Sequence, residues 1–172
     1  IGDTSPEEFA MDAGVERVLH DWTSGEVSPI NESLDFFEPC TGSVLPYQDV
    51  VDFYSRQSDT KDFTYFRSVV PTWDNTARYG QAAYLLHGSN PSLFQQWLES
   101  TITQTQANLP KDRRFILVNA WNEWAEGAHL EPDSRFGYSY LNAIGRALSA
   151  RLYQDDFNVQ HQIPKGCRLQ LS

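Results

Sequence analysis

The sequence of 172 residues lacks the features that mark several large classes of protein. It has no apolar run near the roughly 20 residues that cross a bilayer, so it predicts no membrane insertion. Its two cysteines, Cys40 and Cys167, have a spacing that suits neither a metal site nor a disulfide framework. No glycine-rich phosphate loop follows any strand-like segment, which removes the main support for a dinucleotide-binding domain.

Positive charge is also scarce. There are 13 Lys and Arg residues against 23 Asp and Glu residues, which gives a net charge of -10. Such a chain repels phosphate backbones and anionic lipids, so nucleic acid and membrane surfaces are poor partners, whereas a neutral ligand is not penalised.

The amino-terminal segment lacks two common features, a signal peptide and an initiating Met. Residues 1–14 lack the basic start and apolar stretch of a signal peptide, which favours a cytoplasmic location and leaves the compartment open. They also lack an initiating Met, so we expect a processed chain or part of a longer one.

Helical and strand-like segments alternate along the chain. Apolar periodicity and capping residues predict helices near 5–20, 46–57, 91–107 and 136–152, and apolar runs predict strands near 33–37, 65–71 and 114–121. A weaker segment, 81–88, fits either a strand or a loop with a helical turn. This order predicts an α/β domain over residues 1–172, with parallel strands and crossover helices.

A doubly wound sheet and a piece of a (β/α)8 TIM barrel both fit this order. A whole barrel takes about 250 residues, so we expect an incomplete barrel, the carboxyl-terminal part of one. The first helix should begin with Ser5 as its cap and Pro6 at its first position. The last helix should bury a stripe made of Leu141, Ile144, Leu148 and Leu152.

The chemically richest segment is "NAWNEWAEGAHLEPD", residues 119–133, which follows the predicted strand 114–121. On an extended strand, Glu123 and Glu126 would lie about 10 Å apart and face opposite ways. On a turn their Cβ atoms come within about 5–6 Å, and Gly127 permits a sharp bend. We therefore expect a turn that aims both carboxyl groups into one pocket.

Two close carboxyl groups cannot easily both ionise, so one can donate a proton and the other can accept one. Cleavage of a glycosidic bond needs this division of labour, with separations of about 5–5.5 Å in retaining enzymes. Around the pair, Trp121 and Trp124 can pack on the C–H faces of sugars, and Asn119 and Asn122 can bind sugar hydroxyl groups. The plainer interpretation is a solvated strand end with buried indole rings.

A second polar segment, "PTWDNTAR", follows the predicted strand 65–71. The default interpretation pairs Asp74 with Arg78 as a structural ion pair. The alternative is a substrate wall in which Trp73 is a platform and Asp74, Asn75 and Arg78 bind hydroxyl groups. Both polar segments follow strand ends, which is where ligands bind in either architecture.

No metal site or cofactor is predicted. His129, Glu131 and Asp133 alternate, but Pro132 interrupts them and the sequence has no second cluster of ligands.

The segments "WDNTAR", "FILVNAWNEWAEGAHLEPD" and "GYSYLNAI" resemble the WbsX-like proteins, which carry a glycoside hydrolase family 99-like domain and are associated with bacterial lipopolysaccharide and other surface polysaccharides. The resemblance is strong from Tyr65 to Leu148. It implies a (β/α)8 barrel and endo-α-mannosidase-like chemistry on a glycan. It implies that Glu123 is the base at the sugar 2-hydroxyl, that Glu126 is the acid/base at the glycosidic oxygen, and that the route passes through a 1,2-anhydro sugar. Ala125 stands where those relatives have a histidine.

Three functions remain open at this stage. The leading one is hydrolysis of glycosidic bonds by the Glu123/Glu126 pair. The second is glycosyl transfer during polysaccharide assembly. The sequence offers no nucleotide-sugar site, which counts against this function. The third is a sugar-binding module without catalysis.

Overall fold

The computed structural model describes residues 4–18, 25–57 and 61–149. The ends predicted for the first and last helices, at residues 19–20 and 150–152, lie outside these ranges.

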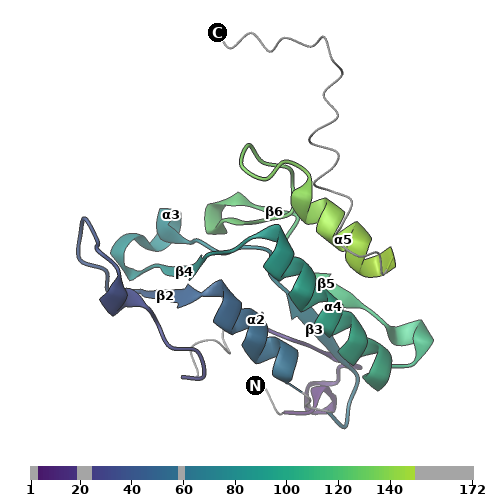
Figure 1. The fold of residues 1–172 in the computed structure, drawn as a ribbon. Helices are drawn as coiled ribbons and strands as arrows, with labels where there is room; N and C mark the ends of the chain where they lie inside the picture. Colours follow the sequence, from purple (N-terminus) through teal and green to yellow (C-terminus); the bar gives the residue numbers. More distant parts are fainter. Residues whose placement is uncertain (1–3, 19–24, 58–60, 150–172) are drawn as a thin grey trace, which may run out of the picture.

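Parallel strands with crossover helices form the body of the structure (Figure 1). The central sheet has three strands in the order β1–β3–β5, and all pairings are parallel. The strands are β1 (Gly14–Val15), β3 (Tyr65–Val69) and β5 (Ile116–Val118), and the main helices are α2 (Tyr47–Arg56), α4 (Pro91–Asn108) and α5 (Ser139–Ser149). Because α2, α4 and α5 follow β1, β3 and β5 in turn, the chain is a mixed α/β structure of the kind that the alternation predicted.

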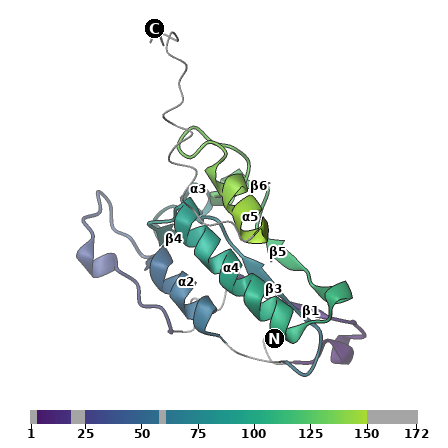
Figure 2. The same cartoon turned by 45° about the vertical axis from the view of Figure 1, so that its right-hand side comes forward.

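The three main helices form one layer on one face of this sheet (Figure 2). Helix α4 lies in the middle of the layer and packs against both α2 and α5. A doubly wound sheet carries helices on both faces. In the described part of the chain, the second face has no helix, so the sheet is covered on one side only.

The core lies between the sheet and this helix layer. Val69 and Val70 are fully buried beneath Trp97 of α4, and the ring of Tyr54 stacks on Trp97 with a centroid distance of 5.0 Å. The hydroxyl of Tyr47 donates to the Val70 carbonyl at 2.6 Å. Burial, with a smaller contribution from Tyr140, raises the pKa of Tyr47, so this phenol remains a donor.

Two smaller sheets extend from the loops that follow the central strands. Strands β2 (Ser43–Pro46) and β4 (Tyr84–His87) pair in parallel, and they come from the connections after β1 and β3. Strands β6 (Asn122–Glu123) and β7 (Ala128–His129) form an antiparallel hairpin after β5. Both polar segments singled out above therefore lie beyond the carboxyl ends of β3 and β5.

Helices α2 and α4 lie where their periodicity predicted them. In α4, the side chain of Asn90 caps the first turn by accepting from the backbone N–H groups of Ser92 and Leu93, each at 3.1 Å. The apolar stripe of α4 faces the core through Phe94, Trp97 and Leu98. Burial of such a stripe is the main source of helix stability in proteins.

Over residues 5–17, the helix predicted near 5–20 does not form. The cap at Ser5 and the position of Pro6 are as expected, but the turn ends at Phe9, and Ala10 has a left-handed φ of 54°. Strand β1 follows it instead. The Gly14 N–H bonds to the Thr64 carbonyl at 2.9 Å, so pairing with the chain next to β3 overrides the local helical pattern.

The strand predicted near 33–37 is also wrong. Residues Asn31–Ser33 form a 3-10 turn, and Phe37 after it is fully exposed. The strand of this region is β2, ten residues later. The Asn31 side chain explains the shift, because it donates to the Gly42 carbonyl and accepts from the Val44 N–H and so fixes the turn beside β2.

Three further elements differ in extent. Segment 81–88 contains both of its predicted alternatives, a 3-10 turn at Gly80–Ala82 followed by β4. In the predicted strand 114–121 only Ile116–Val118 pairs with β3, because the chain then turns into the hairpin. Helix α5 starts at Ser139, and its buried side chains are Tyr140, Ala143 and Ala147. Of the predicted stripe, Leu141 and Ile144 pack partly buried against the core, Leu148 is 71% exposed, and Leu152 lies outside the described residues.

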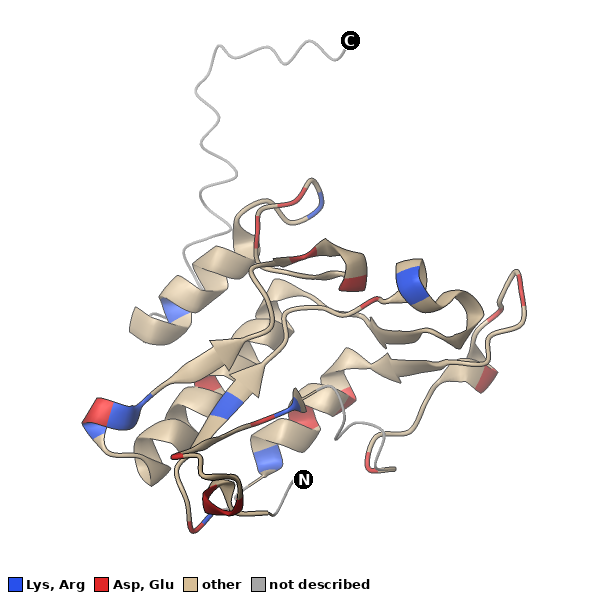
Figure 3. Ribbon diagram, turned by 180° about the vertical axis from the view of Figure 1, so that it is seen from behind, with Lys and Arg blue, Asp and Glu red and all other residues tan. Residues whose placement is uncertain are grey.

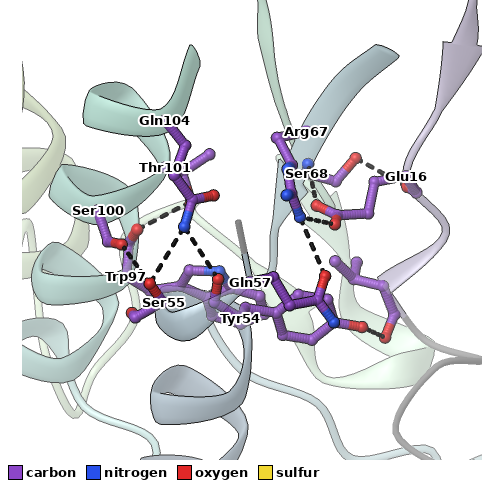
Figure 4. A network of polar contacts seen from close by, with 11 residues as sticks. Glu16, Tyr54, Ser55, Gln57, Arg67, Ser68, Trp97, Ser100, Thr101 and Gln104 are labelled. Atoms are coloured by element: carbon purple, nitrogen blue, oxygen red, sulfur yellow. Dashed lines mark hydrogen bonds and ion pairs between the residues drawn. The ribbon is translucent and has the colours of Figure 1, made fainter. Parts of the chain in front are cut away.

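A buried ion pair fastens β1 to β3 (Figure 4). Arg67 donates to Glu16 at 2.7 Å, and their side chains are only 7% and 3% exposed. The second Glu16 carboxylate oxygen accepts the Ser68 N–H at 2.9 Å, and Arg67 also reaches Gln57, the residue that follows α2, at 3.1 Å. The pair therefore joins the edge strand, the central strand and a helix.

We predict that Arg67→Met lowers the free energy of unfolding by about 3–5 kcal/mol, because it removes the guanidinium that pairs with the buried Glu16 carboxylate. The double variant Glu16→Gln/Arg67→Met should recover part of this loss. Chemical denaturation of both variants and the wild type measures the effect. A loss below about 1 kcal/mol in the single variant would show that Glu16 is solvated in solution.

Candidate carbohydrate site at the β5 hairpin

The turn expected between Asn122 and Gly127 is a tight hairpin. Residues Trp124–Glu126 form a 3-10 turn between β6 and β7, and the Gly127 N–H closes it on the Trp124 carbonyl at 3.1 Å. Gly127 has a φ of 58°, a left-handed conformation that suits glycine.

The hairpin tip docks on the loop that follows β3. The backbone N–H of Asp74 donates to the Glu126 carbonyl at 2.8 Å. A Cβ atom placed on Gly127 would lie 3.0 Å from the Asp74 nitrogen and 3.1 Å from the Asp74 carbonyl oxygen. The two backbones therefore lie so close that a side chain at position 127 would press on Asp74.

One guanidinium joins the two carboxylates of the hairpin. Arg78, in the short helix α3 (Thr76–Tyr79), lies 2.9 Å from a Glu126 oxygen through Nη1 and 3.3 Å from a Glu123 oxygen through Nη2. Figure 3, viewed from behind, shows this basic stretch beside the acidic stretches of the hairpin. The turn therefore brings Glu123 and Glu126 to the same guanidinium.

The default pairing of Asp74 with Arg78 is not what the structure forms. Asp74 Oδ1 instead accepts from the backbone N–H of Thr76 at 3.0 Å and from its hydroxyl at 2.7 Å. This leaves Arg78 for the glutamates. The exposed fractions of the Arg78, Glu123 and Glu126 side chains are 48%, 40% and 20%, so the cluster is open to a ligand.

Trp124 lies on the other side of the hairpin. Asn122 pairs with His129 and Glu123 pairs with Ala128, and successive strand residues face opposite ways, so His129 and Glu123 point away from each other. The indole of Trp124 stacks on the His129 ring at 3.8 Å, and its N–H donates to Glu131 at 2.7 Å. The sequence predicts Trp124 beside the glutamates, whereas this stack places it with His129.

Two other residues of the expected substrate wall, Asn75 and Trp73, make structural contacts within the protein. Asn75 is 6% exposed, and its side-chain oxygen accepts the Tyr84 N–H at 2.7 Å, which orders the connection into β4. Trp73 is also 6% exposed and belongs to the core. Neither side chain offers a ligand the free hydrogen-bonding face or indole platform that the sequence suggested.

The remaining three expected residues lie along the loop after β5. Trp121 is 51% exposed, and Asn122 is exposed beside it. The Asn119 amide nitrogen is buried and has no hydrogen-bond partner among the described residues. Trp121 is therefore the exposed indole of this loop that is not stacked on His129.

Sequence reasoning did not find the polar network behind the hairpin. His129 Nε2 lies 3.0 Å from Asp133, and Asp133 Oδ1 accepts the backbone N–H groups of Arg135 and Phe136. Burial opposes ionisation of Asp133, but the bonds from Phe136, His129 and Arg135 outweigh it and hold its pKa below the ordinary value. The alternation of His129, Glu131 and Asp133 in the sequence is the signal from which this network could be found.

Within residues 4–18, 25–57 and 61–149, no group of three or more His, Cys, Asp or Glu side chains is arranged to hold a metal ion. No helix in those ranges is long and apolar enough to cross a bilayer.

The comparisons with known proteins decide the family. A family model described as glycosyltransferase WbsX matches residues 3–144. The chain belongs to the WbsX family. The resemblance seen in the sequence motifs is therefore confirmed, and the family is one of carbohydrate-active proteins by its description.

Relatives in the WbsX family include the uncharacterized protein WxcX from two strains of Xanthomonas campestris pv. campestris. They are 37% and 45% identical to this chain over 147 residues. These matches cover 84% of this chain and 20% of each relative, so the chain spans about a fifth of their length. A solved glycoside hydrolase-like protein shares 14% identity with a TM-score of 0.42, over 59% of this chain and 29% of that one. A likeness at this level carries no argument about function.

We predict that Gly127→Ala lowers the free energy of unfolding by about 1–3 kcal/mol, because alanine is strained at this φ and its Cβ would press on the Asp74 backbone. Gly145→Ala is the matched control. Gly145 lies inside α5 with no atom within 4 Å of an added Cβ, so this change should stabilise the protein by about 0.5–1 kcal/mol. Equal stability of the Gly127→Ala variant and the wild type would mean that the hairpin does not dock on Asp74. Denaturant titration compares the three proteins.

Proposed function

We propose that the protein cleaves glycosidic bonds with the Glu123/Glu126 pair, by endo-α-mannosidase-like hydrolysis of a bacterial surface glycan. The observation that carries the proposal is the shared contact of both carboxylates with Arg78, at 3.3 and 2.9 Å. It supports a common ligand position for the two side chains. WbsX membership supports carbohydrate as the substrate class.

The proposed reaction has two steps. Glu123 takes the proton of the sugar 2-hydroxyl, and that oxygen attacks the anomeric carbon to form a 1,2-anhydro sugar. The bond to the leaving oxygen breaks while Glu126 gives that oxygen a proton. A water molecule then opens the anhydro ring at the anomeric carbon, Glu126 takes a proton from the water, and Glu123 returns its proton to O2. Protons and bonds balance over the cycle.

Arg78 acts in this scheme as a positioning residue. It holds the two carboxylates on one side of the hairpin before the substrate arrives. The contact uses Glu126 as an acceptor, whereas the first step needs its protonated carboxyl group as a donor. Arg78 must therefore release Glu126 when the sugar binds, and an exposed fraction of 48% gives its side chain room to turn away.

Trp121 is the proposed sugar platform of this site. It follows β5, belongs to the same loop as Glu123 and is 51% exposed. An indole face packs well on the C–H face of a pyranose ring, which makes half-exposed tryptophan typical of carbohydrate sites.

The second candidate function is glycosyl transfer, which the description of the family favours. The same two carboxyl groups can serve it if a sugar hydroxyl, and not water, opens the intermediate. Product analysis with and without a second sugar as acceptor separates the two functions.

We predict that Glu126→Gln lowers kcat/KM on α-mannosides by about 10²–10⁴, because it removes the proton donor to the leaving oxygen. Glu123→Gln should have a comparable effect. The assay uses the protein in its full natural length, and the control is Glu32→Gln, at an exposed position of a 3-10 turn far along the chain from the hairpin. Equal activity of Glu126→Gln and wild type would remove Glu126 from the mechanism. Binding without turnover in the wild type would instead support a sugar-binding module.

We also propose that the central sheet is the wall of a (β/α)8 barrel. Its helix-free face carries Val15, Phe115 and Leu117, which are 52%, 59% and 41% exposed. Their neighbours Ile116 and Val118 pack on the opposite side against the core. In a barrel, the face opposite the helices points inward and is filled by side chains, so an apolar face of this kind suits a barrel interior.

The barrel proposal predicts that Leu117→Asp destabilises the full-length protein by several kcal/mol, because it would bury an unpaired charge in the barrel interior. Leu148→Asp is the control, since Leu148 is 71% exposed on α5 and should cost less than about 1 kcal/mol. Thermal unfolding of both variants measures the difference. Equal effects would mean that the helix-free face of the sheet is open to water in the whole protein.

A further inference from the structure

Protein contacts hold the Glu126 side chain only weakly. Within the described part of the chain it bonds only to Arg78, at 2.9 Å, and the Arg78 side chain is 48% exposed. In the proposed reaction Arg78 releases Glu126 when the sugar binds, so this contact does not place the carboxyl group during proton transfer. Its place then depends on the backbone of the 3-10 turn Trp124–Glu126, which carries it.

Trp124 fixes this turn to the rest of the hairpin. Its indole stacks on the His129 ring, with a centroid distance of 3.8 Å and an interplanar angle of 19°. Its N–H donates to a carboxylate oxygen of Glu131 at 2.7 Å. Glu131 is fixed in turn, because its backbone N–H donates to the Trp121 carbonyl at 2.9 Å. Since Trp124 and Glu126 belong to one short turn, a shift of the indole would move the backbone that carries Glu126.

Asp133 fixes His129 from behind. His129 Nε2 lies 3.0 Å from Asp133 Oδ2, and the two side chains are only 13% and 16% exposed. The other carboxylate oxygen, Oδ1, accepts the backbone N–H groups of Arg135 and Phe136. Contacts therefore run without interruption from the loop before α5, through Asp133, His129 and Trp124, to the turn.

The imidazole of His129 is suited to both of its contacts. Asp133 is ionised at neutral pH, and a carboxylate can only accept, so His129 carries a proton on Nε2. Nδ1 is buried and has no hydrogen-bond partner among the described residues, so a proton placed there in the neutral ring would be unsatisfied. The contact with Asp133 therefore uses the edge of the ring, and the stack on Trp124 uses its face.

We propose that His129 and Asp133 are positioning residues for Glu126, which act through Trp124 to fix the turn that carries its carboxyl group. The inference rests on the proposed role of Glu126 in the reaction. His129 faces away from Glu123 across the hairpin, so the pair acts behind the carboxyl groups and not on the sugar. Its effect is on the placement of the proton donor and not on the binding of the glycan.

The test measures kcat and KM of the full-length protein on α-mannosides. His129→Ala removes both links and should lower kcat about 10–100-fold while KM changes less than about threefold, because a misplacement of about 1 Å has an effect of this size on the chemical step. His129→Phe keeps an aromatic face for Trp124 and should retain more activity than His129→Ala. Asp133→Asn keeps an acceptor for the backbone N–H groups of the loop, and it should lower kcat only about three- to tenfold.

Amide hydrogen exchange supplies a readout that needs no activity. The Gly127 N–H closes the turn on the Trp124 carbonyl, so exchange in residues 122–128 should be about tenfold faster in His129→Ala than in wild type, a larger change than in helix α4. Asn90→Ala is the matched control. It removes the side-chain cap of α4, whose hydrogen bonds lie within residues 88–93, and so lowers overall stability. It should leave both kcat and exchange in the hairpin unchanged.

An unchanged kcat in His129→Ala would overturn the proposal. A loss of kcat that Asn90→Ala reproduces would also overturn it, because the network would then have a structural role only. Failure of the hydrolase proposal looks different, because the wild type would then leave α-mannosides intact. Faster exchange of the hairpin in His129→Ala would in that case still assign His129 and Asp133 to fixing the turn, and unchanged exchange would refute both proposals.

Discussion

The hydrogen bond from the Asp74 N–H to the Glu126 carbonyl, 2.8 Å long, is the contact on which the candidate site depends. Strands β6 and β7 have two residues each. A hairpin this short is not stable in water by itself. It keeps its shape because its tip is fixed to the loop after β3, and Gly127 lets the two backbones meet there. The position of both glutamates therefore follows from a backbone contact between the exits of two neighbouring parallel strands.

Side chains then hold the hairpin from two directions with unequal strength. On one side, Arg78 binds both glutamates, but all three side chains are partly exposed, and ion pairs of this kind contribute little to stability. On the other side, Trp124 is fixed by a ring stack and a 2.7 Å hydrogen bond, and His129 by the Asp133 carboxylate. The weak contact faces the proposed substrate, so the carboxylates can be released while the hairpin itself stays in place.

The parts of the fold that the sequence predicted are those with long, periodic patterns. Helices α2 and α4 each bury one apolar stripe, and their signal extends over two turns or more. Strands β1 and β2 have two and four residues, too few to show any period, and their places are set by pairing partners far along the chain. At the start of the chain, local capping signals were not sufficient. Ser5 and Pro6 begin a turn as predicted, but the turn does not continue as an α-helix.

The candidate site, like the fold, was predicted only in part from the sequence. A glycine after two glutamates was enough to predict the turn that brings the carboxylates together. It was not enough to show which side of the hairpin each neighbour would occupy, because that depends on the pairing of Asn122 with His129. Likewise, Trp73 and Asn75 had the residue types of a sugar wall, yet burial in the β3–β4 connection gives them structural contacts. Residue type indicates what a side chain can do, and burial decides whether a ligand can reach it.

The one-sided sheet links this local geometry to the reaction. Helices cover one face, so the loops after β3 and β5 leave the same end of the sheet side by side, and together they supply both carboxyl groups and Arg78. A glycan chain is longer than the span of these two loops, and cleavage within it needs contacts on both sides of the scissile bond. Neighbouring strands of a barrel would end in further loops at the same rim. In the proposed barrel, the helix-free apolar face would point inward and the open glutamate pair would lie at the rim, so this wall would provide the proposed chemistry and adjoining loops the remaining sugar contacts.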